Sequence, residues 1–138
     1  MDYETYRTSY FVDPPPTPRF DYSGLQGLTL YFEAYNSAVD FYTEVFGPPA
    51  YVEGKDTKGW RLGDTWLTLL RGRGGRPRNV EVSVVMNSPA EARRLQTAFI
   101  RAGATGPDPA DRLMYEPIHA CPVTDPFGLD WMIFSPAE

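Results

Sequence analysis

The chain of 138 residues has one cysteine, Cys121, and one histidine, His119. A single cysteine excludes an internal disulfide and is typical of a reducing compartment, so we expect a cytoplasmic protein. No apolar run is long enough to cross a bilayer, and the first residues do not resemble a secretory signal, which predicts no membrane partner. The formal net charge of −5 argues against a nucleic-acid surface.

Proline is concentrated near the start of the chain, where Pro14, Pro15, Pro16 and Pro18 follow one another closely. Proline disfavours regular helix, so residues 1–26 are expected to form an extended arm rich in proline and aromatics. Aromatic residues on both sides of these prolines indicate that the arm packs against its own domain or a dimer partner. A proline-rich ligand for another protein is the alternative. Residues 27–138 are predicted to form one domain.

Two halves of that domain carry the same hydrophobic pattern. Each half begins with an alternating strand and continues with an amphipathic helix, expected at residues 36–46 and 89–102. Each helix is followed by a glycine, Gly47 or Gly103, as is common after a helix end. A shift of 54 residues places Leu28 on Val82 and Phe41 on Leu95, so buried positions coincide. Short strands are expected near 51–53, 59–62, 66–70, 113–115, 118–123 and 129–134.

The segment Thr124–Phe134 reads as a tight turn that leads into an amphipathic strand. In Asp125-Pro126-Phe127-Gly128, proline presets the turn angle and glycine supplies the positive φ that closes it. Together with the helix Ala38–Gly47, this segment resembles the vicinal-oxygen-chelate superfamily of glyoxalase I, bleomycin-resistance proteins and extradiol dioxygenases. The resemblance implies an α+β fold of two βαβββ modules, at about 27–72 and 79–136. It also implies a mixed sheet curled around a central cavity, with the helices outside.

Enzymes of that superfamily usually bind a divalent metal through histidine and glutamate from both modules. Counted from the motifs above, their ligand positions fall on Gly27, Glu81 and Met132, and the strand Trp66–Leu70 offers no carboxylate or imidazole. A lone carboxylate holds a divalent ion weakly, and a thioether is a poor ligand for hard or borderline metals. We therefore expect no metal and no cofactor.

Strand alternation nevertheless turns several chemically useful side chains toward the expected cavity. An aromatic cavity with a few polar groups suits a flat or amphipathic small molecule, and this is the leading hypothesis, with a homodimer as the expected assembly. A metal-dependent lyase, isomerase or dioxygenase with an atypical site at Glu81, Glu33 and His119 is one alternative. A structural protein that uses its arm and dimer surface is another, so whether a reaction is catalysed stays open. The candidate ligand-binding residues are Glu81, Glu33, Tyr31, Trp66, His119, Met132 and Phe134.

Overall fold

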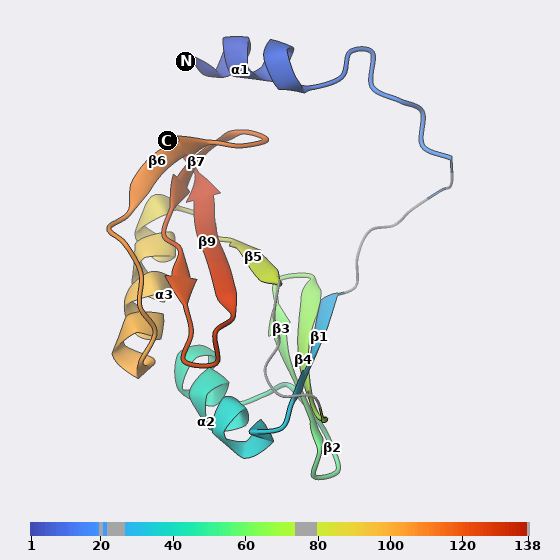
Figure 1. The fold of residues 1–138 in the computed structure, drawn as a ribbon, viewed down its shortest axis with the longest axis vertical. Coiled ribbons are helices and arrows are strands. Elements are labelled where there is room, and N and C mark those ends of the chain that lie inside the picture. Colours follow the sequence, from blue (N-terminus) through green and yellow to red (C-terminus); the bar gives the residue numbers. More distant parts are fainter. Residues whose placement is uncertain (20, 22–26, 74–79, 138) are drawn as a thin grey trace.

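A computed structural model of the chain describes residues 1–19, 21, 27–73 and 80–137. The basic segment that joins the two halves lies mostly outside these ranges. Two modules follow the N-terminal helix α1 (Tyr3–Tyr10) in the chain (Figure 1). The first contains β1 (Gly27–Phe32), α2 (Tyr35–Phe46), β2 (Tyr51–Glu53), β3 (Thr57–Leu62) and β4 (Thr65–Arg71). The second contains β5 (Glu81–Val85), α3 (Pro89–Ala102), β6 (Ala110–Leu113), β7 (Pro117–Ala120), β8 (Val123–Thr124) and β9 (Asp130–Pro136).

The two modules have matching sheet topologies. The four-stranded sheet, called sheet A here, has the order β1-β4-β3-β2, and the second, sheet B, has the order β5-β9-β7-β6 with β8 paired to β9. In each sheet the first strand is parallel to the last long strand, and the other pairs are antiparallel. The predicted fold of two βαβββ modules with mixed sheets is therefore confirmed, and in each module the helix packs on one face of the sheet.

The sheets themselves differ from the expected single curled sheet. In the described residues β1 and β5 are edge strands of separate sheets and do not pair with each other. The modules are joined instead by aromatic packing of α2 against α3 and β9. Phe41 and Phe46 of α2 lie 6.0 Å and 5.6 Å from the ring of Phe99, and Tyr42 lies 5.7 Å from Trp131. Each of the two pockets lined by described residues belongs to one module, one to the first and one to the second.

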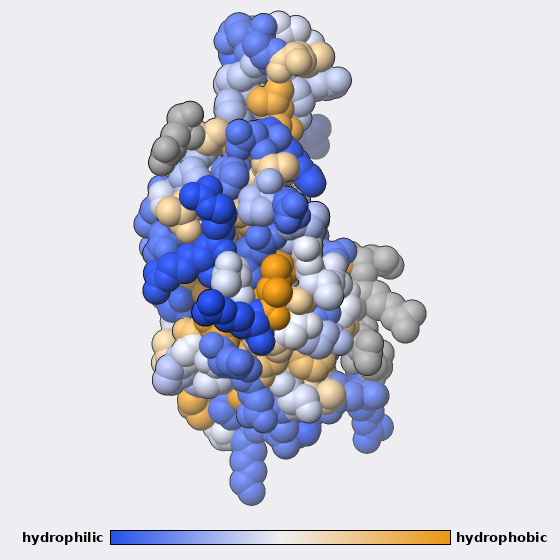
Figure 2. Space-filling model, turned by 90° about the vertical axis from the view of Figure 1, so that its left-hand side faces the viewer, coloured by the Kyte–Doolittle hydropathy of each residue, from blue (hydrophilic) through white to orange (hydrophobic). Residues whose placement is uncertain are grey.

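Local signals explain why the helices begin and end where they do. Ser88 caps α3 by accepting a hydrogen bond from the backbone N–H of Glu91 at 3.2 Å, and Pro89 occupies the first helical position. Gly47 and Gly103 follow the two helices with φ of 87° and 122°. The face of the molecule over α3 is mostly hydrophilic, with only small hydrophobic spots (Figure 2), as expected for a helix that exposes Arg93, Arg94 and Arg101. It offers no large apolar patch for a partner.

The turn at Asp125 links the two modules through a buried carboxylate. One oxygen of Asp125 accepts hydrogen bonds from the backbone N–H groups of Phe127 and Leu129 at 2.9 Å and 3.0 Å. The other accepts from the hydroxyl of Tyr42 on α2 and from the indole N–H of Trp131. Burial, and then the charge of Asp125, raise the pKa of the Tyr42 phenol far above its usual value. The expected turn is confirmed, and it also fixes α2 to the second module.

The N-terminal arm differs from the extended conformation that the prolines predicted. Residues Tyr3–Tyr10 form an α-helix whose first turn is capped by the carboxylate of Asp2. The prolines all lie beyond the end of this helix, so they do not disturb it. No residue of α1 is buried, and its hydrogen bond to the domain runs from the Tyr3 hydroxyl to the Tyr115 carbonyl, at 2.7 Å. No helix in the described part of the chain is both long and apolar enough to cross a membrane.

Candidate functional site

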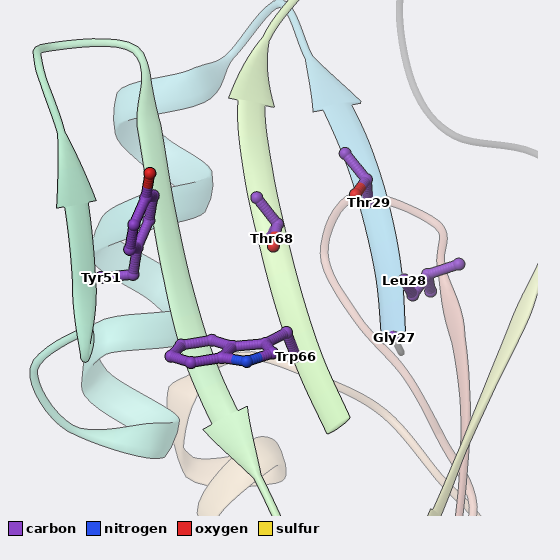
Figure 3. Close-up of a pocket in the computed structure, with 6 residues that line it drawn as sticks. All are labelled: Gly27, Leu28, Thr29, Tyr51, Trp66 and Thr68. Carbon is purple, nitrogen blue, oxygen red and sulfur yellow. The ribbon is translucent and has the colours of Figure 1, made fainter. Parts of the chain in front are cut away.

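The outer face of sheet A, turned away from α2, carries a pocket of about 380 Å³. Alternation along β1 buries Leu30 and Phe32 against the helix and leaves Thr29 and Tyr31 on the outer face, with Tyr31 57% exposed. The register of the parallel pair β1–β4 places Trp66 of β4 beside Gly27, and Thr68 beside Thr29. The pocket is lined by Gly27, Leu28, Thr29, Tyr51, Trp66 and Thr68 (Figure 3).

The aromatic floor of this pocket is the indole of Trp66, which lies across the neighbouring strand β3. Gly59 of β3 lies below both aromatic side chains, since a Cβ added there would be in van der Waals contact with Trp66 Cε3 and Tyr51 Cβ, both at 3.4 Å. The rings of Tyr51 and Trp66 meet nearly at right angles, with centroids 6.3 Å apart. An edge-to-face pair of this kind holds both rings in place and leaves one face of the indole free for a flat ligand.

Two threonine hydroxyls form the polar part of the pocket. Thr29 and Thr68 are register partners on parallel strands, so they stand about 5 Å apart on the same face. Neither hydroxyl, and likewise the indole N–H of Trp66, has a hydrogen-bond partner among the described residues. These groups can donate to oxygen or nitrogen atoms of a ligand, and the described residues that line the pocket carry no formal charge.

Sequence reasoning placed Trp66 and Tyr31 on this face but did not select Tyr51, Thr29 or Thr68. Strand β2 has three residues, too few for alternation to show which way Tyr51 points. The carboxylate of Glu53, which accepts a hydrogen bond from Tyr51, raises the pKa of that phenol. Glu33 lies just past the end of β1 and is exposed, two residues beyond Tyr31.

Gly27 occupies the first position at which the resembling enzymes place a metal ligand, and the backbone leaves it no room for a side chain. A Cβ added there would lie 1.9 Å from the carbonyl oxygen of Trp66. In the part of the chain that the structure describes, no three His, Cys, Asp or Glu side chains form a group that could hold a metal ion. The donor set at this site does not fit the divalent metal typical of the fold.

Glu81 lies on the other sheet, at a second pocket of about 450 Å³. It is exposed, and its register partner across the parallel pair β5–β9 is Asp130, another carboxylate. Met132 and Phe134 follow Asp130 on the same face of β9 and are half-buried. Glu81, Met132 and Phe134 therefore share the outer face of sheet B, whereas Trp66 and Tyr31 lie on sheet A.

His119 stands on the opposite face of sheet B, toward α3. Its register partner Ser135 is buried under the helix, and its Nδ1 lies 2.8 Å from a carboxylate oxygen of Asp111. Its Nε2 lies 3.1 Å from Nη1 of Arg93, which can only donate. The neighbouring Cys121 is fully buried, and burial raises the pKa of its thiol. His119 is thus held by Asp111 and Arg93 and is not grouped with Glu81 or Glu33 in the described residues.

Solved structures with the same fold were found in several bacteria. One is a glyoxalase/bleomycin resistance protein from Albidiferax ferrireducens, with a TM-score of 0.67 and 15% identity over 80% of this chain and 98% of that one. A glyoxalase-related enzyme from Fulvimarina pelagi has a TM-score of 0.63 and 17% identity over 83% and 88% of the two chains. A lactoylglutathione lyase from Agrobacterium tumefaciens has a TM-score of 0.64 and 17% identity over 83% and 95%.

Identities of this size establish the fold and leave the activity open. The sequence itself matches no family model, and a search among curated proteins gave no match either. The structural neighbours are glyoxalase, bleomycin-resistance and dioxygenase family proteins, so the resemblance stated from the sequence is confirmed at the level of fold.

Proposed function

We propose that this protein, which has the fold of the vicinal-oxygen-chelate superfamily, binds a small planar molecule on the outer face of sheet A without using a metal. The observation that carries the proposal is the pocket on Trp66, where one indole face is open beside Tyr51 and two unpartnered threonine hydroxyls. Its volume of about 380 Å³ is at the small end of the usual range for ligand sites.

The ligand expected from these walls is flat, mostly apolar and equipped with hydrogen-bond acceptors at one edge. Stacking on the indole removes apolar area from water, and the threonine hydroxyls select an edge that can accept hydrogen bonds. Metal enzymes of this fold carry a ligand at the position of Gly27. Here the backbone of Trp66 occupies the space that the side chain of such a ligand would need. Binding is the function that this arrangement supports best, since the described residues that line the pocket include no histidine, cysteine, lysine or carboxylate.

A homodimer is the second part of the proposal. The outer faces of both sheets carry large exposed apolar side chains, among them Tyr31 and Tyr51 on sheet A and Val85, 60% exposed, on sheet B. Each edge strand is paired on one side only among the described residues, so its other edge is open to a strand of a second copy. A second copy that covers these faces would bury the apolar side chains and close the pocket from above.

Amide NMR spectra recorded during titration with naphthol test the binding site. We expect shifts confined to the residues that line the Trp66 pocket, saturation at one equivalent, and loss of binding in Trp66→Ala. The matched control is Tyr115→Ala, which removes another exposed aromatic ring from the β6–β7 connection and should leave binding unchanged. Shifts centred on Glu81 and Asp130, or equal binding by Trp66→Ala, would contradict the proposal.

Sedimentation equilibrium tests the assembly. We expect a mass of twice the chain's 15.6 kDa at micromolar concentration and dissociation in a Val85→Glu variant, because a carboxylate would then be buried at the contact. The control is Ile100→Glu on the helix side, which also places a charge at an exposed apolar position. A monomer at high micromolar concentration would refute the dimer and leave the binding site standing.

A further inference from the structure

The two faces of the Trp66 indole have different neighbours. Arg61 is the register partner of Trp66, and its guanidinium carbon lies 5.1 Å from the centre of the indole. Tyr51 and Thr68 both pair with Gly59, which precedes Arg61 by two residues on the same face of β3. In Figure 3 the indole is seen edge-on, with Tyr51 and Thr68 on one side of it. Arg61 therefore covers the face that is turned away from the pocket, and the ligand would meet the other face.

The charge of Arg61 is available to act through the ring. Its Nε donates to the carbonyl oxygen of Gly63 at 3.0 Å, which fixes the side chain over the indole. No carboxylate forms an ion pair with it among the described residues. Glu53 of β2 pairs with Thr57, which precedes Gly59 by two residues on β3. The Glu53 carboxylate accepts a hydrogen bond from the Tyr51 hydroxyl. The guanidinium of Arg61 therefore stacks on one face of the indole, and among the described residues no carboxylate neutralises its charge.

We infer that Arg61 sets the charge preference of the pocket, so that neutral or anionic planar ligands are accepted and cationic ones are rejected. The face of an aromatic ring attracts a positive charge, and Arg61 already uses this attraction from below. A second cation on the upper face would be repelled across a few ångströms in a partly desolvated site. Neutral and anionic rings avoid this repulsion and can accept hydrogen bonds from Thr29, Thr68 and the Trp66 N–H.

This inference rests on the proposed binding site, and three probes of similar shape separate the two claims. Naphthol is neutral, naphthoate is anionic and naphthylmethylammonium is cationic. We expect the cationic probe to bind wild-type protein at least about fivefold more weakly than naphthol, a ratio that corresponds to a repulsion of about 1 kcal/mol between its charge and that of Arg61. Naphthoate should bind at least as tightly as naphthol. Amide spectra would report both the affinity and the location of each probe.

The variant Arg61→Gln removes the charge from an exposed position and keeps an amide that can donate to Gly63. In this variant the affinity ratio of the neutral to the cationic probe should fall to near one. The matched control Arg101→Gln removes the same charge from the last turn of α3 and should leave the ratio unchanged. Equal binding of all three probes at Trp66, or an unchanged ratio in Arg61→Gln, would overturn the role of Arg61 while the site stands. Failure of every probe to bind at Trp66 would overturn both claims.

Discussion

Replacing Tyr42 with phenylalanine removes one hydrogen bond from a buried carboxylate and leaves the ring in place. Tyr42 is fully buried, Asp125 is only 4% exposed, and no arginine or lysine accompanies the carboxylate in the described network. A hydrogen bond to a buried charge contributes about 1.5–3 kcal/mol. We expect Tyr42→Phe to lower the free energy of unfolding at neutral pH by that amount, measured by urea titration. Trp131 and the two backbone N–H groups continue to satisfy Asp125, which keeps the loss within this range.

The pH dependence of the same variant gives a second, independent readout. The pKa of Tyr42 is raised in the folded protein, so the stability linked to it is complete below the unfolded value of 10.0 and declines as the pH rises above that value. Above pH 10 the unfolded chain loses this proton while the folded protein keeps it, so the unfolded state is favoured. The difference in stability between wild type and Tyr42→Phe should therefore narrow by about 1 kcal/mol between about pH 10 and pH 11.

The matched control is Tyr10→Phe, which removes a hydroxyl from a ring that is 66% exposed on α1. It should change the free energy of unfolding by less than about 0.5 kcal/mol. A cost below about 0.5 kcal/mol for Tyr42→Phe would refute the reasoning that the Asp125 network fixes α2 to the second module. A stability difference that stays constant from neutral pH to pH 11 would show that the phenol does not keep its proton in the folded state.

Two further predictions concern positions that the metal-site and catalytic hypotheses singled out. Gly27→Ala should destabilise the protein by about 1–3 kcal/mol in thermal or urea unfolding, because its Cβ would overlap the Trp66 carbonyl, and an unchanged stability would contradict the packing described here. The neutral imidazole of His119 should carry its proton on Nδ1, which donates to Asp111 while Nε2 accepts from Arg93. Imidazole nitrogen shifts report this directly, and a majority of the Nε2–H form would contradict it.

Periodicity and end signals were sufficient to predict both domain helices and the repeated module. The predicted helix at 89–102 coincides with α3, and the one at 36–46 begins one residue after the start of α2. Both carry strong amphipathic patterns and are followed by glycine, and local signals of this kind do not depend on tertiary contacts. Alternation also predicted that Tyr31 and Trp66 lie on the face of their sheet that is turned away from the helix, which was expected to line a cavity.

Features that depend on contacts between strands could not be predicted in the same way. The segment expected as one strand at 118–123 is divided into β7 and β8 at Cys121 and Pro122, and proline cannot donate to a strand ladder. The side of the sheet on which His119 lies is set by pairing with β9, which the sequence alone does not reveal. The prolines that predicted an extended arm begin only at Pro14, so they do not oppose the helix α1, which Asp2 caps.

The role of Gly59 illustrates the same limit on the functional side. Nothing in the local sequence distinguishes this glycine from one in a turn, and its place below Trp66 and Tyr51 appears only when these two side chains converge above it from two other strands. The stacking of Arg61 on Trp66 could not be predicted from the sequence either, because it follows from the register of β3 and β4. Binding sites assembled from several strands are therefore visible in the structure before they are visible in the sequence.

The most direct test of the central claim is a crystal structure of the protein soaked with naphthol. We expect the ring to stack on Trp66, on the face opposite Arg61, with its hydroxyl within hydrogen-bond distance of Thr29 or Thr68. Density for the probe at the Glu81 pocket of sheet B, or a closed Trp66 pocket that admits no probe, would contradict it.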